Sequence, residues 1–335
     1  MTERETQLRA FLDRSGWAGA DRAALAGDAS NRRYERLSDP ATRQTAVLMD
    51  APADKGEDVG PFVEIARFLR ATGLSAPEIL AQDRQAGFLI LEDLGDDLFA
   101  RVLAVRPGLE TQLYETATDV LVVLHRATPP SLAEYSPALM TGLAALALSK
   151  YRDGIRGTPD LAALSRFEDR FGAILRETVA QAPPVLIQRD YHAENLLWLP
   201  RRSGVARVGL LDFQDAMLGH PAYDLVSLLQ DARRDVTPGI ETAMIARYLA
   251  ATRLDPDAFA AAYAVLGAQR NLRILGVFAR LATEYGKPHY LGLVPRVWAH
   301  LERDLDHPAL ATVAGLLRDA LPEPTHANLS ALQVA

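Results

Sequence analysis

The chain has 335 residues, more than a single hydrophobic core usually accommodates, which predicts two lobes or domains. Its 43 acidic and 36 basic residues give a net charge of −7, which argues against a nucleic-acid or polyanion binder. The sequence has no cysteine, which excludes disulfides, thiolate zinc sites and cysteine nucleophiles. The charged opening segment predicts no secretory signal, and no apolar run is long enough to span a membrane, so we expect a cytoplasmic protein.

Residues 1–94 combine strand patterns with helix patterns. An amphipathic helix opens the chain, and alternating residues in "RRYERL" predict a strand. A second strand, "TAVLMD", ends before Pro52, and residues 59–74 show apolar side chains at helical spacing with Gly73 as the expected stop. Two further strands form a hairpin around residues 85–87. The order strand, strand, helix, strand, strand predicts a small nucleotide-binding α+β lobe.

Residues 95–321 are mostly helical in pattern and form the expected catalytic and acceptor-binding lobe. The exception is 184–213, where short β-like runs flank Asp190 and Asp212. Residues 322–335 lack such periodicity and are expected to be a loose tail. The expected fold class is therefore α+β and bilobal, with a small β-rich N-lobe and a large helical C-lobe.

A cluster of polar side chains stands between two apolar runs in "IQRDYHAENLLWL", residues 187–199. Asp190 and Asn195 are five positions apart, and Asp212 ends the next apolar strand, followed by Phe213. This is the D-x-x-x-x-N spacing and Asp-Phe ending of a protein-kinase active site. Mg²⁺ prefers carboxylate and amide oxygens, and an acceptor hydroxyl needs a carboxylate to take its proton. We therefore expect Asp190 to be the base, with Asn195 and Asp212 as metal ligands, rather than simple turn caps.

The stretches "QRDYHAENLL" and "LLDFQDAMLGHPAYDLVSLL" resemble the aminoglycoside phosphotransferase and choline-kinase-like family, which shares the bilobal kinase fold. The resemblance implies ATP and Mg²⁺ as cofactors, and four residues match it one by one: Asp190, His192, Asn195 and Asp212. It further implies that Asp224 braces the loop from the following helix, and we expect His192 and Arg189 to brace it as well. Gln188-Arg189 departs from the usual His-Gly of the family.

Further segments, "GDASNRRYERL", "GFLILEDLGD" and "AQRNLRILGVFARL", resemble one branch of that family, the bacterial N-acetylmuramate/N-acetylglucosamine anomeric kinases of cell-wall recycling. This resemblance implies transfer of the γ-phosphoryl group of ATP to the C1 hydroxyl of an amino sugar. Two alternatives stay open: a related kinase acting on an amino alcohol or antibiotic, and a non-catalytic nucleotide-binding regulator. We expect a monomer with a small-molecule substrate and neither a nucleic-acid nor a membrane partner.

The turn before the "RRYERL" strand lies where a phosphate-covering loop is expected, but it lacks the three glycines of G-x-G-x-x-G. A phosphate loop and an ordinary surface hairpin are both compatible with it. In the first interpretation, backbone N–H groups and arginines approach the phosphates. The candidate nucleotide-binding residues are then Ser30, Asn31, Arg32 and Arg33.

The lysine that kinases carry on the third strand is missing, because Met49 or Asp50 stands at that place. Glu64, on the following helix, would be the lysine's usual partner, or else a solvated helix residue. Glu92 and Leu94 lie where a kinase hinge contacts adenine, although an acidic turn would look the same.

The acceptor sugar is expected against the helical lobe, facing Asp190. The apolar helix "AYAVLGAQRNLRILGVFARL" contains Gln269, Arg270 and Asn271 in a row, of which at most two can face one pocket. Arg270 is a candidate to bind the lactyl carboxylate of N-acetylmuramate, with a structural salt bridge as the alternative. Other candidate substrate contacts are Tyr191, Glu194 and Asn271, with weaker ones at Tyr285, Lys287, His289 and Tyr290.

Overall fold

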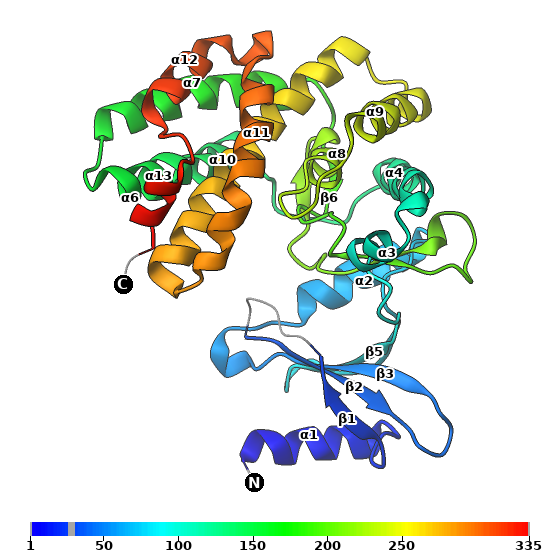
Figure 1. Cartoon of the computed structure of the whole chain (residues 1–335). Coiled ribbons are helices and arrows are strands. Elements are labelled where there is room, and N and C mark those ends of the chain that lie inside the picture. The colour runs from blue at the N-terminus through cyan, green and yellow to red at the C-terminus, as the bar shows by residue number, and fades with distance from the viewer. Residues whose placement is uncertain (1, 26–30, 334–335) are drawn as a thin grey trace. The chain divides into compact units, whose positions relative to one another are not determined.

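The computed structural model describes residues 2–25 and 31–333. The chain divides into two compact units: unit 1 comprises Met1–Val120 and Glu194–Ala216, and unit 2 comprises Leu121–Ala193 and Met217–Ala335. Unit 1 thus extends past the boundary expected near residue 94 and takes in a second segment. An antiparallel sheet in the N-terminal region and a mostly helical remainder confirm the predicted α+β class (Figure 1).

Unit 1 is built on an antiparallel sheet whose described strands run in the order β1-β2-β3-β5-β4. The strands are β1 (Asp21–Ala24), β2 (Arg33–Ser38), β3 (Thr45–Asp50), β4 (Ile79–Asp83) and β5 (Phe88–Glu92). Successive side chains of a strand point to opposite faces of the sheet. On β3, Ala46, Leu48 and Asp50 therefore share one face, and Val47 and Met49 share the other.

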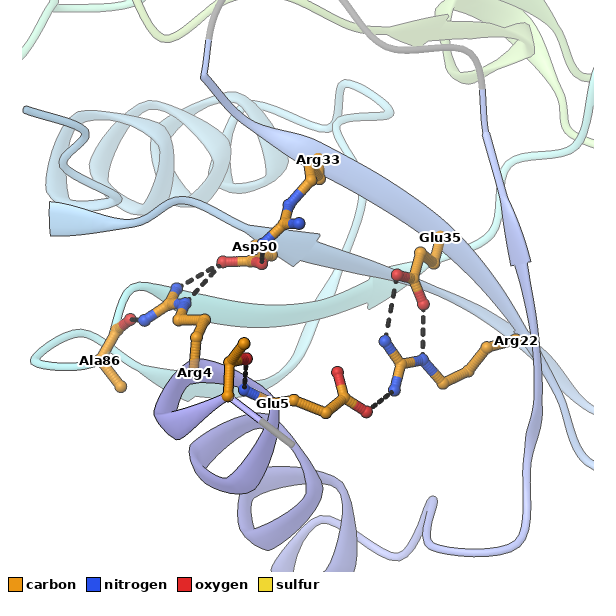
Figure 2. A network of polar contacts seen from close by, with 8 residues as sticks. Arg4, Glu5, Arg22, Arg33, Glu35, Asp50 and Ala86 are labelled. Atoms are coloured by element: carbon orange, nitrogen blue, oxygen red, sulfur yellow. Dashed lines mark hydrogen bonds and ion pairs between the residues drawn. The ribbon is translucent and has the colours of Figure 1, made fainter. Parts of the chain in front are cut away.

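Helix α1 (Glu3–Arg14) packs along the sheet in unit 1 (Figure 1). Its apolar residues form one buried cluster with the sheet: Leu8, Phe11 and Leu12 with Leu37, Ala46, Leu48, Phe88 and Ile90. Around this core, Arg4 lies over the Phe88 ring at 3.8 Å and donates to Asp50, while Arg22 bridges Glu5 and Glu35 (Figure 2). The face that carries Leu48 and Asp50 is therefore the one that α1 covers.

The rest of unit 1 connects this sheet to short helices and a second ribbon. Helix α2 (Gly60–Ala71) buries an apolar stripe and ends before Gly73, whose φ of 81° suits the predicted stop. The antiparallel pair β7 (Leu196–Trp198) and β8 (Val208–Leu210) lies in the same unit. The remaining elements are η1 (Ala53–Lys55), α3 (Phe99–Val105), η2 (Pro107–Leu109) and η4 (Gly204–Arg207), and α4 (Glu110–Arg126) contains the boundary between the units.

Unit 2 is helical apart from the antiparallel pair β6 (Val185–Ile187) and β9 (Met217–Gly219). Its central element is α10 (Pro256–Tyr285), which starts at the cap Asp255 and ends at Gly286, and α11 lies beside it (Figure 1). The other elements are α5 (Pro137–Ala144), the π-helix η3 (Ala147–Arg152), α6 (Asp153–Arg156), α7 (Leu161–Val179), α8 (Ala222–Leu229), α9 (Pro238–Thr252), η5 (Pro288–Leu293), α11 (Val294–Leu305), η6 (Pro308–Leu310), α12 (Ala311–Ala320) and α13 (His326–Ala331). Among the helices in the described part of the chain, none has the length and apolar character to cross a membrane.

The C-terminal segment was expected to be a loose tail. The structure places the short helix α13 in it, capped by the Thr325 side chain, which accepts from the Asn328 N–H. Leu332, just beyond the helix, is fully buried. Six residues are too few to show an apolar period, so this helix was not readable from the sequence.

A buried polar network ties α8, α10 and α11 together inside unit 2. The Asp304 carboxylate accepts from Gln230 Nε2 at 2.8 Å and from Asn271 Nδ2 at 3.2 Å. Asn271 Nδ2 also lies 2.7 Å from Gln230 Oε1. Gly267 permits this approach, because a Cβ there would lie 2.4 Å from Asp304 Oδ2. Burial raises the pKa of Asp304 to about 8, although these two amide donors oppose the shift.

We expect Asp304→Asn to change how stability depends on pH. In the wild type the folded pKa of about 8 lies above the ordinary 3.8, so the folded chain binds the extra proton between these values. The contribution of Asp304 to stability is then complete below about pH 4 and is lost as the pH rises through 8, at up to about 1.4 kcal/mol per pH unit. The amide does not titrate. Urea denaturation of both proteins from pH 5 to 8 should give a wild-type-minus-variant difference that falls with pH, and a flat difference would contradict the assignment.

Candidate active site

The loop that follows β6, residues 188–193, is held by helix α8. The Asp224 carboxylate, in the first turn of α8, is fully buried and accepts from the N–H groups of Gln188 at 2.6 Å and Arg189 at 2.9 Å. Ser227 Oγ donates to the Arg189 carbonyl oxygen at 3.2 Å. These bonds hold Arg189 in the left-handed region, with a φ of 72°. Asp224 thus braces the loop in the way that the family resemblance implied.

Asp190 is surrounded by positive charge within unit 2. Burial alone would raise the pKa of its carboxyl group, but the guanidinium groups of Arg273, Arg270 and Arg189 hold that pKa below its ordinary value. Asp190 is therefore a carboxylate at neutral pH. A carboxylate in this state can accept a hydrogen bond, and then the proton, from a hydroxyl group.

His192 is 4% exposed, and burial lowers the pKa of its imidazole to about 4, against the opposing charge of Asp231. The ring is thus neutral at pH 7. Arg233 Nη1 lies 3.3 Å from His192 Nε2, which suits an arginine donating to an unprotonated ring nitrogen. This fixed, neutral ring agrees with a bracing role rather than with proton transfer at neutral pH.

In unit 1 the structure brings together the two residues predicted as metal ligands. Asn195 precedes β7 and Asp212 follows β8, and the Leu211 N–H donates to the Asn195 carbonyl oxygen at 3.0 Å. Asn195 Nδ2 lies 3.3 Å from Asp212 Oδ2, and Gln214 Nε2 donates to Asp212 Oδ1 at 2.6 Å. One carboxylate beside one amide fits Mg²⁺, which usually takes few protein ligands and completes its shell with phosphate and water oxygens.

The candidate phosphate-loop residues fall partly within the described chain. Ser30 lies outside the described residues. Asn31 and Arg32 are held by Glu57, whose carboxylate accepts from the Asn31 N–H at 3.0 Å and from Arg32 Nε at 2.8 Å. Glu57 was not predicted from the sequence, since nothing in its neighbourhood indicates a partner 25 positions earlier. Arg33 pairs instead with Asp50, at 2.7 Å.

The structure separates the two residues that could occupy the place of the missing lysine. Asp50 accepts from Arg4 Nε at 3.0 Å and so points to the face that α1 covers (Figure 2). Met49 therefore lies on the opposite face of β3, and it is 1% exposed. Glu64 lies on the exposed side of α2. Its role as a nucleotide contact stays a prediction.

The acidic turn after β5 is engaged in ion pairs within unit 1. Arg202 Nη2 donates to Glu92 Oε1 at 2.5 Å, and Arg36 Nε lies 2.8 Å from Asp93 Oδ2. Leu94 packs near Gly209, where an added Cβ would lie 3.2 Å from Leu94 Cδ1. The carboxylate of Glu92 thus has a structural function. A hinge contact to adenine would have to come from the backbone of this turn.

The consecutive polar residues of α10 turn in different directions. Gln269 Nε2 donates to the Met140 carbonyl oxygen at 3.0 Å, Arg270 Nη1 donates to the Gln230 carbonyl oxygen at 3.2 Å, and Asn271 joins the Asp304 network. All three side chains are buried. Arg273 lies one turn beyond Arg270 and was not predicted from the sequence. Its spacing of three residues from Arg270 could have indicated it, because residues three apart on a helix are neighbours on its surface.

Two other predicted sugar contacts differ in exposure. Tyr191 is 1% exposed, whereas Glu194 lies on the surface of unit 1. Tyr285 is 61% exposed, and the rings of His289 and Tyr290 pack together at 4.4 Å. The sugar contacts of these residues stay predictions.

Comparison with known proteins identifies the family. A family model described as the phosphotransferase enzyme family matches residues 21–263. This range begins at β1 and contains Asn195, Asp212 and Asp224. The chain belongs to the phosphotransferase enzyme family. The predicted resemblance is confirmed, and the chain is a kinase.

Two relatives within the phosphotransferase family align over nearly their whole length. A protein of Caulobacter vibrioides named N-acetylmuramate/N-acetylglucosamine kinase is 42% identical, covering 97% of this chain and 98% of its own. A Pseudomonas aeruginosa protein of the same name is 34% identical, covering 96% and 98%. The crystal structure of an ADP-bound aminoglycoside phosphotransferase shares the fold, with a TM-score of 0.60 at 14% identity, covering 94% of this chain and 98% of that one.

Proposed function

We propose that this phosphotransferase moves the γ-phosphoryl group of ATP to the C1 hydroxyl of N-acetylmuramate or N-acetylglucosamine, as a step of cell-wall recycling in the cytoplasm. The observation that carries the proposal is the 42% identity, over nearly the whole chain, to a relative named for these two sugars. An ionised Asp190, and Asn195 and Asp212, which lie beside each other, supply the groups that such a reaction needs.

The proposed chemistry uses few residues. The sugar's C1 oxygen attacks the γ-phosphorus as the bond from that phosphorus to the β–γ bridging oxygen breaks, releasing ADP, and Asp190 takes the hydroxyl proton. Asp212 and Asn195 would hold Mg²⁺, which, when bound, neutralises charge on the phosphate oxygens. Asp224 keeps the Asp190 loop in place through its two backbone bonds.

Further residues are proposed to contact the nucleotide and the sugar. Asn31 and Arg32 would approach phosphate, and in the free chain the Glu57 carboxylate accepts from the Asn31 N–H and from Arg32 Nε. The other nucleotide candidates are Ser30, Arg33, Glu64, Glu92 and Leu94, and those for the sugar are Tyr191, Glu194, Arg270 and Asn271.

The test is ADP release by the purified protein with ATP and Mg²⁺, given N-acetylmuramate, N-acetylglucosamine, choline or kanamycin in turn. We expect turnover on the two amino sugars only, with ³¹P NMR of the product showing an anomeric phosphate. Turnover on choline or kanamycin alone would keep the kinase and replace the substrate. Measurable ATP binding with no turnover on any acceptor would favour a non-catalytic regulator.

A further inference from the structure

Two adjacent residues of α8 connect Asp190 with an arginine of α10. Asp224 holds the backbone of the loop at Gln188 and Arg189, as described above. Its neighbour Tyr223 is 1% exposed, and its hydroxyl oxygen accepts a hydrogen bond from the Arg273 guanidinium. Because one helix fixes both, the position of Arg273 relative to the loop of Asp190 is set within unit 2.

A pair of buried tyrosines makes this arrangement rigid. The rings of Tyr135 and Tyr223 meet edge to face, with centroids 5.1 Å apart, and their hydroxyl oxygens lie 3.4 Å apart. The Arg189 guanidinium lies over the Tyr135 ring at 5.2 Å. Each tyrosine of the pair thus contacts one arginine, Tyr135 with Arg189 and Tyr223 with Arg273. Aromatic and cation–π contacts of this kind restrict the motion of the side chains that make them.

Arg273 is better placed for a ligand than Arg270. Arg270 is 2% exposed and already donates to the Gln230 carbonyl oxygen, which leaves little of its surface for an acceptor. Arg273 lies one turn further along α10, on nearly the same face, and is partly exposed. Its bond to the Tyr223 hydroxyl uses only part of the five N–H donors of a guanidinium group.

The two sugars of the proposed function differ in charge. N-acetylmuramate carries a lactyl ether with a carboxylate, where N-acetylglucosamine has a hydroxyl group. A guanidinium group binds a carboxylate through two parallel hydrogen bonds, which gives both energy and direction. We propose that Arg273 binds this carboxylate and thereby sets the preference between the two sugars. This proposal rests on the proposed function.

The experiment measures kcat/KM of the wild type, Arg273→Met and Arg273→Lys for three acceptors: N-acetylmuramate, its methyl ester and N-acetylglucosamine. Methionine keeps much of the side-chain length without the charge. The ratio of kcat/KM for N-acetylmuramate to that for N-acetylglucosamine should fall about 10- to 100-fold in Arg273→Met, and less in Arg273→Lys, which keeps the charge without the fork. The wild type should treat the ester like N-acetylglucosamine. Arg166→Met, which removes an exposed arginine of α7, should leave the ratio unchanged.

The ratio cancels any effect that Arg273 has on Asp190 or on folding, because both sugars share these. An equal loss on both sugars in Arg273→Met, or a wild type that uses acid and ester equally well, would overturn the assignment. If Arg273→Met does not fold, the lysine variant and the ester decide. A wild type inactive on both sugars would sink the proposed function itself, whatever the variants do.

Discussion

Asp190→Asn should lower kcat by about 1,000-fold with either amino sugar, because a positioned general base contributes about 100- to 10,000-fold. The amide keeps the shape of the side chain but cannot take a proton. The KM for ATP should change little, since the lost group acts on the acceptor. Steady-state ADP release at saturating ATP measures both. The variant should also keep its affinity for the nucleotide in calorimetry.

The pH profile of the wild type gives a second check on Asp190. Its surrounding arginines hold its pKa below the ordinary 3.8, so the base is ionised throughout pH 5 to 8. The acid limb of kcat/KM due to this group should therefore lie below pH 4. Asp169→Asn, which changes an exposed acid of α7, is the matched control and should match the wild type. A variant at position 190 with more than a tenth of wild-type kcat would show that another group is the base.

Much of the fold follows from local periodicity. The helix α2 buries an apolar stripe along its twelve residues, and four successive residues of β5 are buried, so these patterns alone predict the two elements. Strand β1 has all four residues exposed, and β9 has three residues, so neither carries a pattern that could be read. Their strand conformation depends on pairing with β2 and β6, which lie elsewhere in the chain.

The sequence also does not show which side of β3 faces helix α1. The alternating sets Leu48 with Asp50 and Val47 with Met49 each contain apolar residues, so the sequence could not tell which set α1 covers. The structure decides it through the contact of Arg4 with Asp50, 46 positions apart. The missing lysine could therefore be noticed in the sequence, but not assigned to one position.

In the candidate site, the residues that the sequence predicted are those next to a short motif. Asn195 and Asp212 each adjoin an apolar run, and pairing of those runs as β7 and β8 brings them together. Arg273 contacts Tyr223, 50 positions away, and Glu57 contacts Arg32, 25 positions away, and only the fold reveals such pairs. Asn271, a predicted sugar contact, donates its amide to Asp304 inside the helical unit, and its contact with the sugar stays a prediction.

The orientation and the charge of the pair Asn195 and Asp212 determine how it would attract a metal ion. Asp212 sits at a φ of 55°, outside the usual range of a non-glycine residue, and the bond from Gln214 Nε2 fixes one of its carboxylate oxygens. Protein kinases carry glycine at the corresponding position, which offers no such donor. The hydrogen bond orients Asp212 before any ligand binds. Only one negative charge is then available from this pair to attract a divalent cation.

Asp212→Asn should consequently lower kcat by about 1,000-fold at 1 mM Mg²⁺. A bound metal ion stabilises the transition-state charge by several kcal/mol, and losing it costs a factor of this order. The amide replaces a charged oxygen ligand with a neutral one, so part of the activity should return as Mg²⁺ is raised. Gln214→Ala keeps the carboxylate and should stay within about tenfold of the wild type, since it loses one hydrogen bond. A magnesium titration of ADP release, with melting temperatures to check folding, compares the three proteins. Asp212→Asn with wild-type kcat and magnesium requirement would remove Asp212 from the metal site.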